Sequence, residues 1–278
     1  MNNSRTIKNE IYMEGVGLHS GIKSKLTLIP YENCGINFKT KNGVFGISSA
    51  VVEEDSRLTG FRLPDGTVVR TAEHLLASLV GMSVNSVLIC LEGEEVPILD
   101  GSAHEFALAV DSVGYSELPC ECVKKSVNSP VCIEDEAGGR FISAAPSSKT
   151  RVTYVIDYSG TPIGVQKVSY DINEDVFLNT ISRARTFGLT YELEYLKKAN
   201  LARGGSLDNA LVFDGESLLN EGGLRFPLEC VTHKVIDLLG DLALLGYLPT
   251  ASYTAICAGH GVHGKLVEKL KRVIPPIV

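Results

Sequence analysis

The stretch from Thr232 to Gly246 constrains the fold of this chain most strongly, because it is an apolar helix that carries a row of ionisable side chains. At helical pitch, His233, Asp237 and Asp241 lie one turn apart on a single face. The other positions are mostly valine, isoleucine and leucine, which predicts a mostly buried helix with Thr232 as its N-cap and Gly246 as its end. An unpaired charge buried there costs on the order of several kcal/mol, so the row requires a compensating partner.

A divalent metal ion is one such partner, since an imidazole and a carboxylate one turn apart can both reach a single ion. A catalytic zinc site usually takes three protein ligands, so the rest of the chain must supply a third beside His233 and Asp237. His74, in an apolar helix predicted over 70–81, is the best candidate among the six histidines. The structural alternatives are that the carboxylates are solvated or that the row is a satisfied polar network in a scaffold protein.

Two further groups suit hydrolysis beside such a metal. Glu73 precedes His74 and would sit next to the metal without binding it, where it can take a proton from water as a general base. His260 lies between glycines at the end of a predicted strand, so it can approach a reacting centre closely. Asp241, one turn beyond Asp237, is placed to hold such a histidine protonated. The pattern therefore indicates a metal-dependent hydrolase.

Charge and length exclude other classes of protein. The 278 residues carry a formal net charge of −7 at pH 7 without a block of lysine or arginine, which argues against a general nucleic-acid binder. The first residues lead directly into strand-like alternation, so no secretory signal is predicted, and no apolar run reaches the roughly 18 residues that a membrane span requires. The seven cysteines are odd in number and irregularly spaced, which predicts free thiols in a reducing cytoplasm.

Hydrophobic periodicity divides the chain into two halves of similar build, each beginning with strand-like alternation and continuing into helices. A non-periodic stretch at 119–126 separates them, so we expect two domains, 1–124 and 125–278, that fit a duplicated α+β unit. In the first half the expected elements are a β-hairpin within 5–30, strands at 35–40, 43–48 and 86–91, and helices at 70–81 and 103–113. In the second half they are strands at 131–134, 139–145, 151–158 and 252–258, and helices at 191–199, 232–246 and 265–274.

Eight motifs in one order, spread over about residues 5 to 272, closely resemble those of the bacterial UDP-3-O-acyl-N-acetylglucosamine deacetylases. That family consists of zinc amidases that catalyse the committed step of lipid A biosynthesis. The motifs are Gly-Val-Gly-Leu-His-Ser-Gly (15–21), Thr-Ala-Glu-His-Leu (71–75), Pro-Ile-Leu-Asp-Gly-Ser-Ala (97–103), Arg-Ala-Arg-Thr-Phe-Gly (183–188), Gly-Gly-Ser-Leu-Asp-Asn (204–209), Asn-Glu-Gly-Gly-Leu-Arg-Phe (220–226), His-Lys-Val-Ile-Asp-Leu-Leu-Gly-Asp-Leu (233–242) and Gly-His (259–260).

The resemblance implies two similar α+β domains, each a β-sheet with two helices, with the helices packed between the two outer sheets. It also implies a β-α-β insert near 190–215 that forms a hydrophobic passage for an acyl chain. By motif match, Glu73 becomes the general base, and His260 becomes the cation that stabilises the oxyanion, with Asp241 behind it. The ligands implied for one zinc ion are His74, His233 and Asp237.

Further roles follow from the resemblance alone. Thr186 donates its hydroxyl to the oxyanion, Phe187 lines the sugar or acyl site, and Lys234 meets polar groups of the substrate. Tyr158 is carried over as the aromatic side chain near the uridine, and His19 matches the loop histidine of the family. The implied substrate is UDP-3-O-(hydroxyacyl)-N-acetylglucosamine, whose N-acetyl group a monomeric cytoplasmic enzyme would hydrolyse to acetate and a free amine.

Several alternatives stay open. The same site could act on another N-acyl sugar, or a non-catalytic relative could bind a nucleotide sugar or a lipid, although Glu73 and His260 are needless for binding alone. Two histidines and an aspartate would also accept iron(II) or cobalt in place of zinc. The leaving amine can take its proton from Glu73 or from His260. One departure from the family concerns His263: the family commonly carries Ala-Leu-Asn after the Gly-His pair, whereas this chain has an extra histidine three residues after His260.

Overall fold

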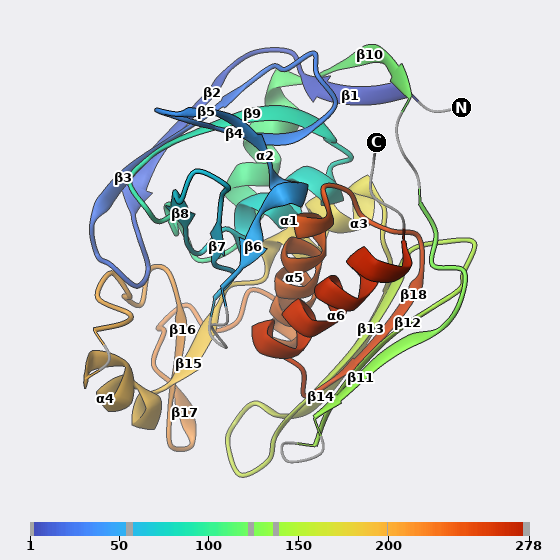
Figure 1. Cartoon of the computed structure of the whole chain (residues 1–278). Coiled ribbons are helices and arrows are strands. Elements are labelled where there is room, and N and C mark those ends of the chain that lie inside the picture. Colours follow the sequence, from blue (N-terminus) through green and yellow to red (C-terminus); the bar gives the residue numbers. More distant parts are fainter. Residues whose placement is uncertain (1–2, 54–57, 122–124, 136–138, 199, 275–278) are drawn as a thin grey trace.

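Two five-stranded β-sheets form the outer layers of the molecule, and the main helices pack between them (Figure 1). The structure is a computed structural model that describes residues 3–53, 58–121, 125–135, 139–198 and 200–274. One hydrophobic core joins buried side chains of both sheets and of the helices between them. The predicted α+β class, with helices between two outer sheets, is confirmed.

The two sheets share one topology. In each, the third and fourth strands in spatial order run parallel and all other neighbours run antiparallel. This identity explains why strands followed by helices recur in the two halves of the sequence. The first sheet contains, in spatial order, β2 (Ile11–Val16), β3 (Lys23–Ile29), β9 (Ser86–Glu92), β4 (Gly35–Thr40) and β5 (Gly43–Gly46). The second contains β11 (Val131–Asp135), β12 (Arg140–Ala145), β18 (Ser252–Ile256), β13 (Arg151–Tyr158) and β14 (Gly164–Asp171).

The helices follow the same repeat. In the first half α1 (Glu73–Gly81) precedes β9 and α2 (His104–Val113) follows it. In the second half α5 (Glu229–Leu242) precedes β18 and α6 (His260–Val273) follows it. Helices α1 and α5, which carry the predicted site residues, therefore occupy equivalent places. The short helix α3 (Glu174–Asn179) lies beside α1 and α2.

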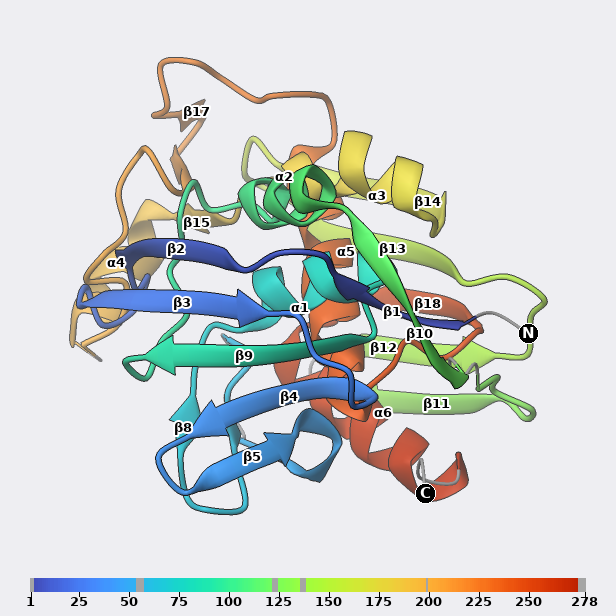
Figure 2. The same cartoon turned by 90° about the horizontal axis from the view of Figure 1, so that it is seen from above.

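Helices α1 and α5 lie side by side in the centre of the molecule (Figure 2). A Cβ atom added at Gly240 would lie 2.4 Å from the carbonyl oxygen of Glu73 and 2.6 Å from its Cα atom. The backbone of α5 therefore touches the first turn of α1 with no side chain between them. Both helices are buried over almost their whole length, as their apolar sequences predict.

A smaller unit extends from the second half. Strand β15 (Phe187–Leu189) pairs in parallel with β16 (Leu211–Asp214), and α4 (Thr190–Lys198) connects the two strands. This confirms the predicted β-α-β insert, which lies at one end of the molecule in Figure 1. The hairpin strand β17 (Ser217–Leu218) completes its sheet. At the corresponding point of the first half stand the short strands β6 (Val51–Val52), β7 (Phe61–Arg62) and β8 (Val68–Val69).

Helix α5 begins at Glu229, about a turn earlier than predicted. The residue before it, Leu228, has a left-handed backbone with φ of 64°, a start that hydrophobic periodicity does not reveal. Thr232, the predicted N-cap, lies inside the helix, and its hydroxyl lies 3.1 Å from the hydroxyl of Tyr170. Gly246 does end the segment, because it adopts φ of +83° after a short 3-10 turn at Ala243–Leu245.

Two other helix ends differ from the prediction. Helix α6 begins at His260 and not at residue 265, because Gly261 and Gly264 are accommodated within its first turns. Helix α1 begins at Glu73 and not at residue 70, and it ends at Gly81 as predicted. A Cβ atom at Gly81 would lie 2.4 Å from the ring of Phe177. Gly81 is therefore required by close packing, and the left-handed residue follows at Ser83, with φ of 55°.

The first strand of the chain pairs with the last strand of the first half. Strand β1 (Asn3–Ile7) pairs with β10 (Tyr115–Glu121) as a separate two-stranded ribbon. The predicted domain boundary near 124 lies outside the described residues and stays a prediction. No helix among the described residues is long and apolar enough to cross a membrane.

The prediction that every cysteine is a free thiol is wrong for Cys34, which is disulfide-bonded. Spacing along the sequence alone could not reveal this bond, because a disulfide depends on which chain segments the fold brings together. Free thiols are present at Cys90, Cys132, Cys230 and Cys257.

We expect Gly240→Ala to lower the free energy of unfolding by about 1–3 kcal/mol, because its methyl group would overlap the backbone of Glu73. Helix propensity alone predicts the opposite, a gain in stability, because alanine forms helices more readily than glycine. The matched control is Gly264→Ala in α6, whose methyl group would have Val52 as its neighbour, at 3.5 Å. In urea unfolding, Gly240→Ala should lose stability while Gly264→Ala matches or exceeds the wild type. Equal stabilities of the two variants would contradict the close approach of α1 and α5.

Candidate active site

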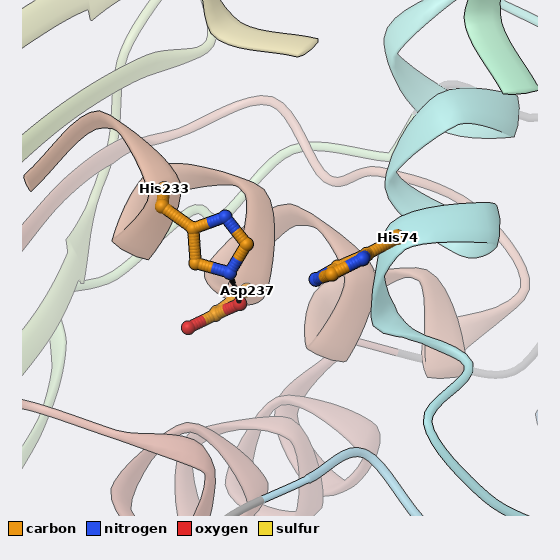
Figure 3. A group of neighbouring side chains, drawn as sticks. All are labelled: His74, His233 and Asp237. Atoms are coloured by element: carbon orange, nitrogen blue, oxygen red, sulfur yellow. Dashed lines mark ion pairs between the residues drawn. The ribbon is translucent and has the colours of Figure 1, made fainter. Parts of the chain in front are cut away.

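The three predicted metal ligands meet in the interface between α1 and α5 (Figure 3). His74 comes from the first turn of α1, and His233 and Asp237 come from successive turns of α5. One ligand atom from each lies within 4.8 Å of the other two, and all three side chains are buried. The helical spacing found in the sequence thus places two of the ligands, and the crossing of the equivalent helices brings the third.

The ring nitrogens are disposed as metal binding requires. His233 Nδ1 lies 2.9 Å from the carbonyl oxygen of Ala184, so this nitrogen carries the proton and Nε2 keeps its lone pair. His233 Nε2 lies 3.2 Å from Asp237 Oδ1. His74 Nδ1 is buried and has no hydrogen-bond partner among the described residues. Burial, with the neighbouring His233, lowers the pKa of His74 to about 3, which keeps it in the neutral form that binds metals.

These features fit a divalent cation. Two neutral imidazoles and one carboxylate form a donor set that suits zinc and leaves a position open for substrate or water. Asp237 is buried, yet the positive charge of Lys234 holds its pKa well below the ordinary range against the effect of burial. The carboxylate is therefore ionised and ready to bind a cation.

Glu73 lies beside the three metal-ligating side chains. Its Oε1 atom lies 4.0 Å from His260 Nε2, and its Oε2 atom accepts a hydrogen bond of 3.1 Å from the backbone N–H of Thr59. Burial raises the pKa of Glu73 to about 7, although the charge of His260 opposes the rise and that of Asp237 adds to it. A carboxyl group with this pKa can accept and release a proton near neutral pH.

His260 faces the same space from the start of α6. Its Nδ1 atom lies 2.8 Å from Asp241 Oδ2, and its Nε2 atom lies 3.9 Å from Asp237 Oδ2. Burial by itself lowers the pKa of His260, but the carboxylates of Asp241, Asp237 and Glu73 outweigh it and raise the pKa to about 9. Nδ1 therefore donates to Asp241, and the imidazolium directs Nε2–H toward Glu73 and Asp237.

Thr59 is a member of the site that the sequence did not reveal. Its hydroxyl donates a hydrogen bond of 2.5 Å to Asp241 Oδ1 and lies 3.4 Å from His260 Nδ1. The residue belongs to a short irregular segment before β7, where neither periodicity nor a charged neighbour marks it. Together with its backbone contact to Glu73, it links the predicted base to the predicted cation.

Three of the predicted substrate-binding residues are neighbours of Asp237 or of one another. Lys234 Nζ lies 2.5 Å from Asp237 Oδ2. The rings of Tyr158 and Phe187 meet edge to face with centroids 5.4 Å apart. Burial raises the pKa of Tyr158 and the charge of Lys234 lowers it, so the ammonium group lies near the Tyr158 side chain. The structure thus brings an apolar surface and a cation next to Asp237.

Hydrogen bonds to backbone groups of other segments hold Thr186 and His19. The N–H of Thr186 donates to the carbonyl oxygen of Gly101 at 2.8 Å, and its own carbonyl oxygen accepts from Leu211. This fixes Thr186 at the start of β15, directly before Phe187. His19 lies in the hairpin loop before β3, and its Nδ1 atom accepts a hydrogen bond of 3.3 Å from the N–H of Ala202.

A buried ion pair explains two of the sequence motifs in structural terms. Glu229 at the start of α5 is fully buried and accepts hydrogen bonds from the Arg185 side chain at 2.8 Å and from the backbone N–H of Arg225 at 2.7 Å. The motifs at 183–188 and 220–226 therefore hold the first turn of α5 in place. Sequence reasoning missed this role, because the three segments are far apart along the chain.

The fold and the buried group define a class of protein: an α+β pair of repeats in which two histidines and an aspartate that could hold a metal ion lie where equivalent helices meet. The model of the UDP-3-O-acyl N-acetylglycosamine deacetylase family matches residues 4–272, and the chain belongs to this family.

Individual relatives agree with the family match over nearly the whole chain, and each carries the name UDP-3-O-acyl-N-acetylglucosamine deacetylase. The protein from Synechocystis sp. is 40% identical over 274 residues, which cover 95% of this chain and 97% of that protein. The protein from Oleidesulfovibrio alaskensis is 39% identical, with 96% of this chain and 88% of the relative covered. The protein from Myxococcus xanthus is 39% identical, with 96% and 86% covered.

We expect the wild-type protein to retain about one equivalent of a divalent metal after dialysis, and His233→Ala to lose it. Loss of an outer partner of a metal ligand already lowers affinity about 10–100-fold, so loss of a ligand should cost at least as much. The control is His104→Ala, because His104 bonds Ser182 at 3.0 Å and lies outside the metal-ligating group. Metal content by atomic emission should separate the two variants, and equal retention by both would contradict the ligand set.

Proposed function

We propose that the protein hydrolyses the N-acetyl group of UDP-3-O-(hydroxyacyl)-N-acetylglucosamine, in the committed step of lipid A biosynthesis, with zinc as its metal. The observation that carries the proposal is the convergence of Glu73 and His260 beside the three metal-ligating side chains. A buried base and a buried cation next to each other, beside one group able to bind a metal, serve amide hydrolysis, whereas binding alone needs neither. Membership of the deacetylase family supports the substrate.

In this proposal His74, His233 and Asp237 hold the zinc ion. Bound there, zinc supplies Lewis acidity toward an amide carbonyl and toward water. A set of two nitrogens and one oxygen would also take iron(II) or cobalt, and zinc is the ion that this donor set commonly selects in hydrolases.

The proton steps fall to residues of the chain. Glu73 takes a proton from the attacking water as the new C–O bond forms at the acetyl carbon. The imidazolium of His260, held by Asp241, stabilises the developing oxyanion together with the hydroxyl of Thr186. The C–N bond then breaks, and the amine leaves with a proton from Glu73 or from His260, which gives acetate and the free 2-amino sugar.

Substrate recognition is assigned to the surface next to Asp237 and to the insert. The edge-to-face pair of Tyr158 and Phe187 provides apolar area for the uridine and for the sugar or acyl group. Lys234 is directed at polar groups of the substrate, and His19 contacts the insert from the opposite hairpin. The β-α-β insert near 190–215 is the proposed passage for the acyl chain.

We also propose a domain organisation, an oligomeric state and a location. Two domains comprise residues 1–124 and 125–278. A monomer suffices, since both halves of one chain supply the site residues. A cytoplasmic location follows from the nucleotide-sugar substrate. The disulfide at Cys34 removes the support for this location that a full set of free thiols would have given.

The second candidate function is that of a zinc amidase acting on another N-acyl sugar. It keeps the same metal and proton chemistry and differs in the surface formed by Tyr158, Phe187 and the insert.

We expect Glu73→Ala to lower the rate of acetate release from this substrate about 10²-fold or more, because the variant lacks the general base. Glu92→Ala, at the exposed end of the central strand β9, is the matched control and should turn over like the wild type. A chelator should abolish activity and added zinc should restore it. If zinc binds but no acetate appears, the substrate is wrong; if Glu73→Ala keeps full activity, the base is wrong.

The rate should depend on pH as a bell. Glu73 acts ionised, so activity rises as pH passes the pKa of Glu73, which is about 7. His260 acts protonated, so activity falls as pH passes its pKa of about 9. A bound cation lowers the pKa of both groups, so the two limbs should fall at or below these values. Measuring kcat/KM between pH 5 and 10 tests this, and a flat profile would exclude the pair.

A further inference from the structure

His263 extends the group around Asp241 away from the metal ligands. It lies in the first turn of α6, three residues after His260, and its side chain is fully buried. Its Nδ1 atom lies 2.7 Å from Asp241 Oδ2, the same oxygen that His260 Nδ1 approaches to 2.8 Å. Its Nε2 atom lies 2.9 Å from the hydroxyl of Tyr154, a fully buried residue of β13.

The protonation of these atoms follows from their partners. Burial lowers the pKa of His263 against the opposing pull of Asp241, so the ring is neutral and carries one proton. A carboxylate only accepts hydrogen bonds, so the proton sits on Nδ1 and donates to Asp241. Nε2 then accepts a hydrogen bond from the hydroxyl of Tyr154. The carbonyl oxygen of Ala258 lies 2.8 Å from the same hydroxyl, so the two acceptors share its one hydrogen.

These bonds also hold the backbone that presents His260. Ala258 and Gly259 belong to the connection from β18 to α6. The hydroxyl of Tyr154 donates a hydrogen bond to the carbonyl oxygen of Ala258. The backbone N–H of His263 donates to the carbonyl oxygen of Gly259 at 2.9 Å. The ring of His260 is thus fixed from two directions, through Asp241 and through the turn that precedes it.

Asp241, His260 and His263 also come close enough together to hold a metal ion. However, the two short nitrogen–oxygen distances are those of N–H groups donating to one carboxylate oxygen, an arrangement that is complete without an ion. The same carboxylate accepts from Thr59 through its other oxygen, so three donors fix its orientation. His263 provides one of these three donors and contacts none of the metal ligands.

We propose that His263, supported by Tyr154, is a positioning residue that fixes Asp241 and thereby aims the Nε2–H of His260 at the reacting amide. The inference rests on the proposed amide hydrolysis. Loss of the His263 donor lets the carboxylate rotate, and His260 then turns away from the direction in which the oxyanion develops. Small misplacements of a catalytic group lower the rate steeply without weakening substrate binding.

Two substitutions at position 263 separate the donor from the bulk of the ring. Asparagine carries Nδ2 on Cγ, where histidine carries Nδ1, so His263→Asn keeps the donor to Asp241 and loses the contact with Tyr154. Leucine fills similar space without a donor. We expect His263→Leu to lower kcat about tenfold or more with KM nearly unchanged, and His263→Asn to stay within about threefold of the wild type. Both should keep one equivalent of zinc.

Tyr154→Phe keeps the packed ring and removes only the hydroxyl, so it tests the support should His263→Leu fail to fold. We expect a smaller loss of kcat, about threefold, again with KM unchanged. If His263→Leu and Tyr154→Phe both turn over like the wild type, the positioning role is excluded. If His263→Asn falls as far as His263→Leu, the ring matters for packing and not for its donor. Binding of a second zinc equivalent that is lost in His263→Asn would overturn the hydrogen-bonded arrangement in favour of a metal site.

A readout that needs no substrate separates this inference from the proposed function. In protein with ¹⁵N-labelled histidine, the Nδ1–H proton of His260 should resonate far downfield because it donates to a carboxylate. This resonance should persist in His263→Asn and should shift or broaden in His263→Leu. An unchanged resonance in His263→Leu would overturn the positioning role, whether or not the wild type releases acetate.

Discussion

The balance of charge in the interface between α1 and α5 is the constraint on which the site depends. Glu73, Asp237 and Asp241 are each about 95% or more buried, and an unpaired charge in such a place costs several kcal/mol. Their negative charges are compensated by His260 and Lys234, and by the metal ion that His74, His233 and Asp237 are disposed to bind. Because Gly240 lets the helix backbones touch, these groups from two distant parts of the chain share one small volume. Removing any member leaves the others uncompensated, so the chemistry and the packing of the central helices are inseparable.

Much of this arrangement could be predicted from the sequence, since local spacing determines it. The i, i+4, i+8 spacing places His233, Asp237 and Asp241 on one face of α5 in any fold that forms this helix. Hydrophobic patterning predicted the strands of both sheets except β14, and the order of the motifs indicated the family that the comparisons then showed. His74 could be selected as the third ligand because few histidines stand in apolar helices. Its meeting with the other two remained a prediction until the crossing of α1 and α5 was known.

Contacts between distant segments and helix ends set by backbone geometry could not be predicted. Thr59 joins the site through the fold of an irregular segment, and nothing in its sequence neighbourhood indicates a bond to Asp241. The start of α5 depends on a left-handed Leu228 and on the burial of Glu229 against Arg185, so the composition around Thr232 pointed to the wrong residue. His260 was expected between glycines at the end of a strand, whereas it begins α6, and this helix brings His263 next to Asp241. In each case a tertiary contact decides what the local pattern leaves undetermined.

We propose that the buried polar row of α5, completed by His74, is a metal site built from two imidazoles and one carboxylate. X-ray absorption spectroscopy at the zinc edge, on protein carrying one equivalent of zinc, tests this ligand set directly. Only nitrogen and oxygen neighbours at about 2.0–2.2 Å are expected, with the outer-shell scattering of two imidazole rings. In His74→Ala, the outer-shell scattering of one imidazole ring should be lost. A sulfur neighbour at about 2.3 Å would place the metal on the cysteines instead and would contradict both the site and the mechanism built on it.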